Sequence, residues 1–173
     1  APNEKGQTLQ LADYKGKKLV LYFYPKDDTP GCTAQACSLR DSYGAFQAKG
    51  YDVLGVSPDS VKKHVKFQDK YNLPFDLLSD EDHAVSLAYG VWGEKKFMGR
   101  AYMGIHRTTF VIDENGKIER IIAKVNTLFE GELTDDRAPW ATAAEIEGEA
   151  APEEGWIVDT IDDRAEVLGA SCA

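Results

Sequence analysis

One uninterrupted apolar run, residues 19–24, constrains the fold of this 173-residue chain more than any other feature. It consists of leucine, valine and aromatic residues with no polar residue between them, and Gly16 and Pro25 bound it. With Lys18 before it, a short run of this kind predicts a strand over residues 18–24 that is buried on both faces, as in a sheet with helices on each side. The chain must therefore supply helices that cover both faces of a sheet.

Helix and strand patterns alternate after this run. Residues 33–49 carry apolar side chains at helical spacing and end at Gly50. The next predicted elements are a strand over 51–57, a helix over 61–71 capped by Asp59 with Val61, Val65, Gln68 and Tyr71 facing inward, a strand over 75–79, and a helix from Asp80 or Asp82 to Tyr89. Residues 91–104 show no period, so we expect a loop there.

The last two predicted strands cover residues 108–113 and 117–125. Asn115 and Gly116 lie between them, and Asn-Gly between two apolar runs is a strong signal for a β-hairpin. Alternating strands and helices favour a largely parallel sheet, to which the hairpin adds antiparallel strands. The predicted fold is therefore an α/β three-layer sandwich with a central mixed sheet.

Charge divides the chain into two parts. Residues 126–173 contain 13 acidic and 2 basic residues, a net charge of −11, whereas residues 1–125 have a net charge of +2. We therefore expect one domain over residues 1–125 and an acidic C-terminal extension over residues 126–173, with a short helix near its end. A clustered basic face is lacking, which argues against a nucleic-acid partner, and no apolar run approaches the ~20 residues of a membrane span.

Cys32 follows Pro30 and Gly31 and comes immediately before the first predicted helix. Unpaired backbone N–H groups and the helix dipole stabilise an anion at that end of a helix, so a thiolate nucleophile is indicated. The alternative is a small buried apolar residue. Thr29, three residues earlier, can offer its hydroxyl to the same pocket or simply close a turn.

Cys37 gives the spacing C-x4-C, which differs from the C-x-x-C of dithiol oxidoreductases. In an ideal helix the two Cα atoms would be ~8.6 Å apart, beyond the ~7 Å that a disulfide tolerates. If the two sulfurs join, the first turns of the helix must unwind. Zinc is a poor alternative because the three histidines lie singly in unrelated segments.

These residues carry a resemblance to a known family. Pro25, Thr29 and Cys32 match the P-x-x-x-T-x-x-C signature of peroxiredoxins, and the position of Cys37 resembles the Q-type, or bacterioferritin-comigratory, branch. The similarity continues through residues 89–92 and 104–113 and covers roughly residues 3–125. It implies a thioredoxin-like fold and a thiol peroxidase that needs no cofactor and no metal.

The resemblance also implies a role for each site residue. Cys32 corresponds to the peroxidatic cysteine, which becomes a sulfenic acid, and Cys37 to the resolving cysteine, which forms an intramolecular disulfide with it. Arg107 corresponds to the active-site arginine that stabilises the thiolate and the polarised peroxide. Thr29 would donate a hydrogen bond to the thiolate or peroxide, and Pro25 would shield the pocket from water.

The implied partners are a peroxide substrate and a thioredoxin- or glutaredoxin-type dithiol as reductant. We expect a monomer in a reducing compartment, the cytoplasm or an organelle such as a plastid if a transit peptide has been removed. The chain begins after the point where the family has an N-terminal strand, so the pairing at that sheet edge is expected to be missing.

Three alternatives stay open at this point. The main one is a redox-switched binding or sensor protein whose helix unwinds on disulfide formation. A thiol-disulfide oxidoreductase is disfavoured by the C-x4-C spacing. Cys172 is either an exposed free thiol or an alternative resolving cysteine.

His106 precedes Arg107 in a predicted strand, so we expect its side chain on the face opposite Arg107 and assign it no role in the site.

Overall fold

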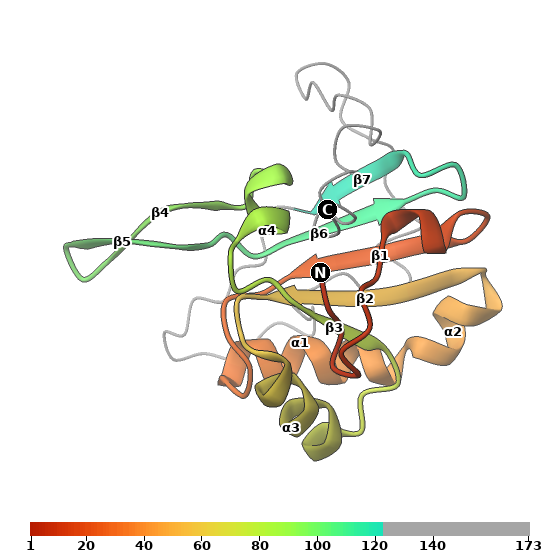
Figure 1. The fold of residues 1–173 in the computed structure, drawn as a ribbon, viewed down its shortest axis with the longest axis horizontal. Helices are drawn as coiled ribbons and strands as arrows, with labels where there is room; N and C mark the ends of the chain where they lie inside the picture. Colours follow the sequence, from red (N-terminus) through yellow and green to blue (C-terminus); the bar gives the residue numbers. More distant parts are fainter. Residues whose placement is uncertain (123–173) are drawn as a thin grey trace, which may run out of the picture.

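The computed structural model describes residues 1–122, and within them a five-stranded sheet forms the centre of the molecule (Figure 1). Its strands are β1 (Lys18–Phe23), β2 (Tyr51–Ser57), β3 (Asp76–Ser79), β6 (Thr108–Ile112) and β7 (Ile118–Ile122), in the order β3-β2-β1-β6-β7. The strands β1, β2 and β3 are parallel, whereas β6 runs antiparallel to both β1 and β7. The predicted mixed α/β sheet with a closing hairpin is confirmed.

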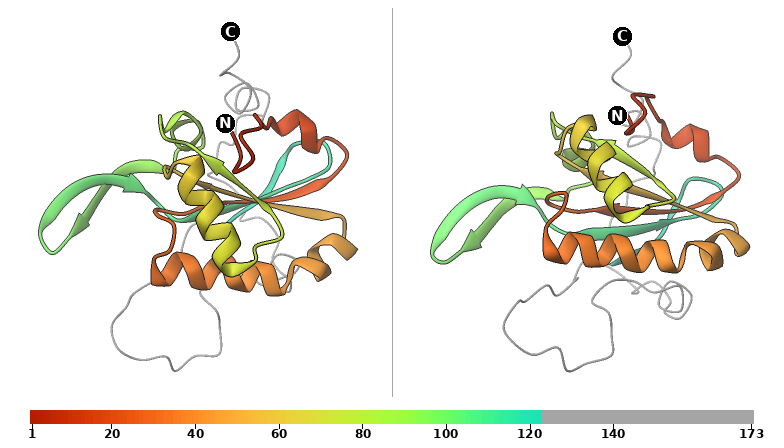
Figure 2. Two further views of the ribbon diagram at one scale, coloured as in Figure 1. Left: turned by 60° about the horizontal axis from the view of Figure 1, so that its bottom comes forward. Right: turned by 90° about the horizontal axis from the view of Figure 1, so that it is seen from below.

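Helices cover both faces of this sheet (Figure 2). The helices α1 (Pro30–Asp41) and α2 (Tyr43–Ala48) lie on one face, and the 3-10 helix η1 (Leu11–Tyr14) and α4 (Ala84–Ala88) lie on the other. The helix α3 (Val61–Tyr71) lies beside β3 at the sheet edge. Of the helices in residues 1–122, none has the length and apolarity that a membrane crossing requires.

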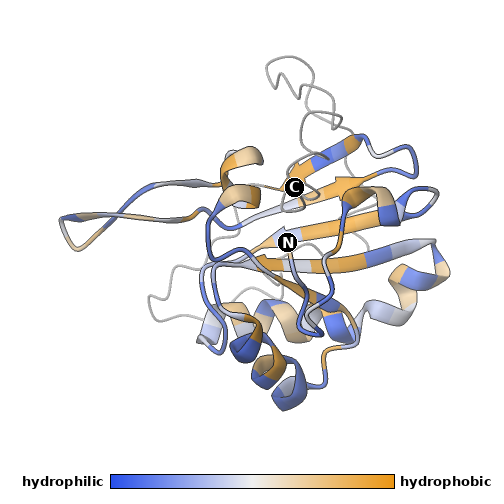
Figure 3. Ribbon diagram, viewed as in Figure 1, coloured by the Kyte–Doolittle hydropathy of each residue, from blue (hydrophilic) through white to orange (hydrophobic). Residues whose placement is uncertain are grey.

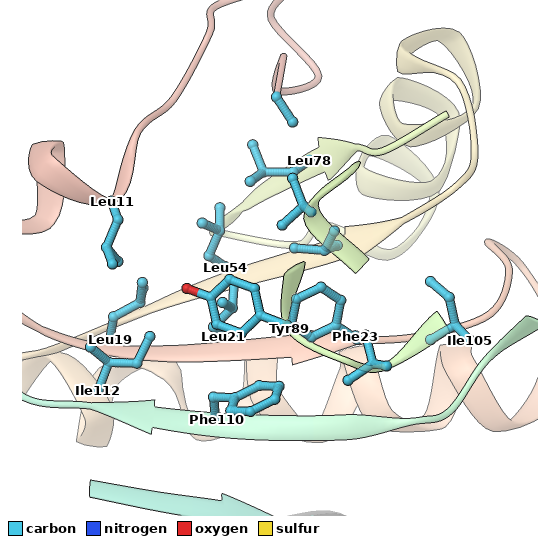
Figure 4. Close-up of a cluster of buried hydrophobic side chains, with 14 residues drawn as sticks. Leu11, Leu19, Leu21, Phe23, Leu54, Leu78, Tyr89, Ile105, Phe110 and Ile112 are labelled. Atoms are coloured by element: carbon cyan, nitrogen blue, oxygen red, sulfur yellow. The ribbon is translucent and has the colours of Figure 1, made fainter. Parts of the chain in front are cut away.

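The strand β1 is buried on both faces, as its apolar run predicts. Leu19, Leu21 and Phe23 point into a core with η1 and α4 (Figure 4), while Val20 and Tyr22 point into a second core with α1 and α2. Hydropathy follows this arrangement, because the central strands are apolar and most polar residues lie on the outer helices and loops (Figure 3). β1 therefore has apolar layers on both sides, and its C-terminal end leads into the loop before α1.

The helix predicted over residues 33–49 differs from the structure at its N-terminal end and in its middle. It begins at Pro30, with Thr29 as N-cap residue, because proline is well suited to the first helical position. It also breaks at Ser42, which ends α1 and precedes α2, and Gly44 weakens the helix just beyond. Cys32 is therefore inside the first turn and not before it.

The inward face of α3 was also predicted incorrectly. Val65 is 38% exposed, whereas His64 and Phe67 are fully buried. The polar identity of His64 hid it from a pattern of apolar residues. The N-cap residue is Ser60, and Asp59 instead accepts a hydrogen bond from the Asp27 amide in the loop before α1.

The start of α4 agrees in part with the prediction. Its N-cap position is His83, but Asp80 and Asp82 accept hydrogen bonds from the first N–H groups of the helix, as predicted.

Residues 91–104 do not form the expected loop. They contain a hairpin of β4 (Trp92–Phe97) and β5 (Arg100–Ile105), which projects away from the body as an arm (Figure 1). Its turn residues, Met98 and Gly99, both have positive φ, as hairpin turns with two central residues require. Most residues of the arm are at least partly exposed on both faces, so the sequence shows no alternation.

The chain start lies along β3 and covers that edge of the sheet. Asn3 forms a β-bridge with Leu78, and the Ser79 amide donates to the Pro2 carbonyl. The Glu4 side chain accepts a hydrogen bond from the Leu77 amide. The expected lack of pairing at this edge is therefore not observed.

The predicted extension over residues 126–173, its terminal helix and Cys172 lie outside the described residues.

Candidate active site

Cys32 lies in the first turn of α1, two residues after Pro30. Its side chain is buried, with only 2% of the residue exposed. The Thr33 amide donates to the Thr29 carbonyl and closes this turn. The amides of the first turn that have no carbonyl partner within the helix give this end of α1 a positive potential. The sulfur therefore lies where the backbone stabilises a negative charge.

Arg107 precedes β6 and reaches across the end of the sheet to this turn. Its Nη2 donates to the Cys32 Sγ at 3.0 Å, and its Nη1 donates to the Gln35 side-chain carbonyl. A guanidinium beside a sulfur stabilises the thiolate, and the second donor of Arg107, on Gln35, holds the planar group in place. The structure thus brings together two residues that are 75 positions apart in the sequence.

Gln35 is a site residue that our sequence prediction missed. It is buried, and it lies one turn after Cys32 on the same face of α1. Its carbonyl accepts the second hydrogen bond of Arg107 and thereby holds the guanidinium over the sulfur. The i, i+3 spacing from Cys32 is the sequence signal that could have identified Gln35, because residues three apart lie on the same face of a helix.

Thr29 and Pro25 lie in the loop between β1 and α1, and both are half-buried. The Thr29 hydroxyl donates to the Lys26 carbonyl at 3.0 Å. In this structure the hydroxyl therefore closes the loop, which is the second of the two roles that the sequence left open for Thr29, and it makes no hydrogen bond to the sulfur. Pro25 directly follows the buried Tyr24 at the end of the β1 run.

Cys37 lies five residues after Cys32 in the same helix and is half-buried. Neither cysteine is in a disulfide. Because α1 is continuous over both positions, the ideal-helix separation of ~8.6 Å applies to this pair. Within residues 1–122, no three His, Cys, Asp or Glu side chains are grouped closely enough to hold a metal ion.

Lys95 on β4 is a second residue that we missed. Its Nζ donates to the Ile105 carbonyl at 3.0 Å, two residues before Arg107. Burial lowers the pKa of Lys95, the positive charge of Arg107 lowers it further, and Cys32 acts in the opposite direction. The base of the arm therefore places a second cation near the site. The exposed His106, which precedes Arg107, lies against Gly93 of β4.

Comparisons with known proteins agree with this geometry. The AhpC/TSA family model matches residues 1–121. Peroxiredoxin Bcp of Bacillus subtilis is 52% identical over 122 residues, which cover 70% of this chain and 78% of the relative. Peroxiredoxin Bcp of Escherichia coli is 50% identical over 126 residues, which cover 73% and 81%.

A solved structure is similar over the same region. A cysteine-to-serine mutant of peroxiredoxin Q from Xanthomonas campestris superposes with a TM-score of 0.67 at 38% identity, covering 70% of this chain and 77% of that one. The resemblance read from the P-x-x-x-T-x-x-C signature is thereby confirmed. The chain belongs to the AhpC/TSA family, as a peroxiredoxin of the Q-type or Bcp branch and hence a thiol peroxidase.

Proposed function

We propose that the protein reduces hydrogen peroxide and organic hydroperoxides with Cys32 as the peroxidatic residue. The observation that carries this proposal is the 3.0 Å contact between the Arg107 Nη2 and the Cys32 Sγ in the first turn of α1. The thiolate attacks the terminal peroxide oxygen, the O–O bond breaks, and the sulfur becomes a sulfenic acid. The other oxygen leaves as water or an alcohol after it takes up a proton.

Arg107 supports the charge that moves during this step. It donates to the sulfur in the ground state, and its second donor bond to Gln35 keeps the guanidinium in place. As the O–O bond breaks, negative charge develops on the leaving oxygen next to a cation that is already oriented, which lowers the barrier. Thr29 would turn its hydroxyl from the Lys26 carbonyl to the thiolate or the peroxide, and Pro25 would shield the pocket from water.

Cys37 then resolves the sulfenic acid. Its thiolate attacks the oxidised sulfur, water leaves, and an intramolecular disulfide forms. This step requires α1 to unwind, since both cysteines lie in one helix whose geometry keeps the Cα atoms beyond disulfide reach. A thioredoxin- or glutaredoxin-type dithiol would return both cysteines to the thiol form by exchange. We place this cycle in a monomer within a reducing compartment, the cytoplasm or an organelle.

Two cysteine variants test this function. Cys32→Ser should abolish peroxide consumption coupled to a thioredoxin system, and full activity of this variant would refute the proposal. Cys37→Ser should leave the first reaction with peroxide intact and stall recycling. Unchanged thioredoxin-driven turnover would remove Cys37 from its role. Mass mapping after one equivalent of peroxide should show Cys32 joined to Cys37.

A redox-switched binding protein is the second candidate function. It is favoured by the same placement of both cysteines in α1, because oxidation must then change the surface around this helix. A pull-down with the reduced and the oxidised protein distinguishes it. Identical partners in both states would reject a switch.

A further inference from the structure

The loop that carries the chain from β1 to Cys32 is attached to α3 by a buried acid–histidine pair that the mechanism above does not use. The Asp27 Oδ2 lies 2.7 Å from the His64 Nδ1, and both side chains are almost completely buried, with exposed fractions of 5% and 0%. Tyr24 donates its hydroxyl to the other carboxylate oxygen at 2.7 Å. The Asp27 backbone amide donates to the Asp59 carboxylate at 2.7 Å.

The other nitrogen of the imidazole ties the pair to the sheet. The His64 Nε2 lies 3.0 Å from the Leu78 carbonyl of β3. A carbonyl only accepts, so Nε2 carries a hydrogen, and a second hydrogen lies in the contact between Nδ1 and Asp27. The pair as a unit is therefore electrically neutral, which makes its burial tolerable. His64 thus bridges the sheet and the loop from its place on α3.

Asp28, the residue after Asp27, also attaches the loop to α3, but through exposed contacts. Asp28 has a positive φ of 55° and accepts hydrogen bonds from Lys70 and from the Tyr71 hydroxyl, both at the end of α3. Exposed ion pairs contribute little to stability. The buried contacts of Asp27, its pairing with His64 and its amide bond to Asp59, are therefore the ones that fix where the loop lies.

We propose that His64 is a positioning residue for Cys32. Through Asp27 it fixes the loop five residues before the sulfur, so that Thr29 lies at the N-cap position of α1 and the first helical turn meets Arg107. The proposal deepens the proposed function, on which it rests for the role of Cys32. A small shift of this loop would move the sulfur relative to the guanidinium, and misplacements of about 1 Å can cost ~100-fold in rate.

Two amide substitutions separate the two contacts of His64. In His64→Asn the amide nitrogen takes the place of Nδ1 and keeps a donor toward Asp27. In His64→Gln it takes the place of Nε2 and keeps a donor toward the Leu78 carbonyl only. Both variants lose the ring, so they share its packing defect. Lys66→Met, an exposed change on the same helix, is the background control.

The first readout is the rate at which reduced protein reacts with hydrogen peroxide. We expect His64→Asn to stay within ~3-fold of the wild type and His64→Gln to slow by ~10-fold or more. The second readout is the pH dependence of Cys32 alkylation by iodoacetamide, which we expect to move to higher pH only in His64→Gln. Thermal unfolding of both variants shows whether they are folded.

Equal alkylation profiles in His64→Asn and His64→Gln, or equal peroxide rates, would overturn the proposal. A purely structural role of His64 would lower the unfolding temperature of both variants but would not make their rates or profiles differ. If neither variant folds, Tyr24→Phe removes one hydrogen bond from Asp27 with almost no change in size. We then expect a slowing of ~3-fold or more, and an unchanged rate overturns the inference. Wild-type protein that does not react with peroxide would refute the proposed function instead, while the alkylation profiles would still test His64.

Discussion

Replacing Arg107 with methionine removes the cation at the Cys32 sulfur while keeping a side chain of similar length. In the structure this change deletes the 3.0 Å hydrogen bond to Sγ and the bond that holds the guanidinium on Gln35. A hydrogen bond to a charged group contributes ~1.5–3 kcal/mol. At 1.36 kcal/mol per factor of ten, the reaction of Cys32 with peroxide should slow by ~10-fold to ~150-fold.

Competition for hydrogen peroxide against a haem peroxidase measures this rate without a reductant. Arg107→Lys should be intermediate, because an ammonium keeps the charge but cannot donate to Sγ and Gln35 with a planar fork. Arg100→Met, on the exposed arm, changes the net charge equally and is the matched control. A wild-type rate in Arg107→Met, or an equal loss in Arg100→Met, would refute the electrostatic role of this contact.

The structure makes two further predictions about stability. Gly55→Ala should lower stability by ~1–3 kcal/mol in urea unfolding, because a Cβ there would lie 2.7 Å from the Leu77 side chain and 2.8 Å from the Tyr22 hydroxyl; wild-type stability would show that the core can absorb the methyl group. Burial raises the pKa of Asp59, but hydrogen bonds from Lys63 and the Asp27 amide outweigh it, so the pKa is lowered from its ordinary value of 3.8. The charged form therefore stabilises the fold above that value and loses this contribution as the pH falls below it. Stability measured between about pH 5 and pH 3 should thus fall more steeply in the wild type than in Asp59→Asn, and parallel curves would contradict this.

Local sequence patterns were sufficient for the features that carry a strong signal within a few residues. The run over residues 19–24 predicted a strand buried on both faces, and Asn115-Gly116 predicted the hairpin of β6 and β7. The signature around Cys32 indicated the family. These features depend on backbone geometry and on side chains a few residues apart, which a single sequence displays directly.

The tertiary structure decided which distant residues meet. Arg107 and Gln35 converge on Cys32 because β6 pairs with β1, whose C-terminal end leads into α1. His64 was hidden because a buried polar residue interrupts the apolar pattern of α3, and its place inside is possible only because Asp27 and the Leu78 carbonyl satisfy both ring nitrogens. Such pairings depend on the packing of whole elements against one another, and no periodicity within one segment records them.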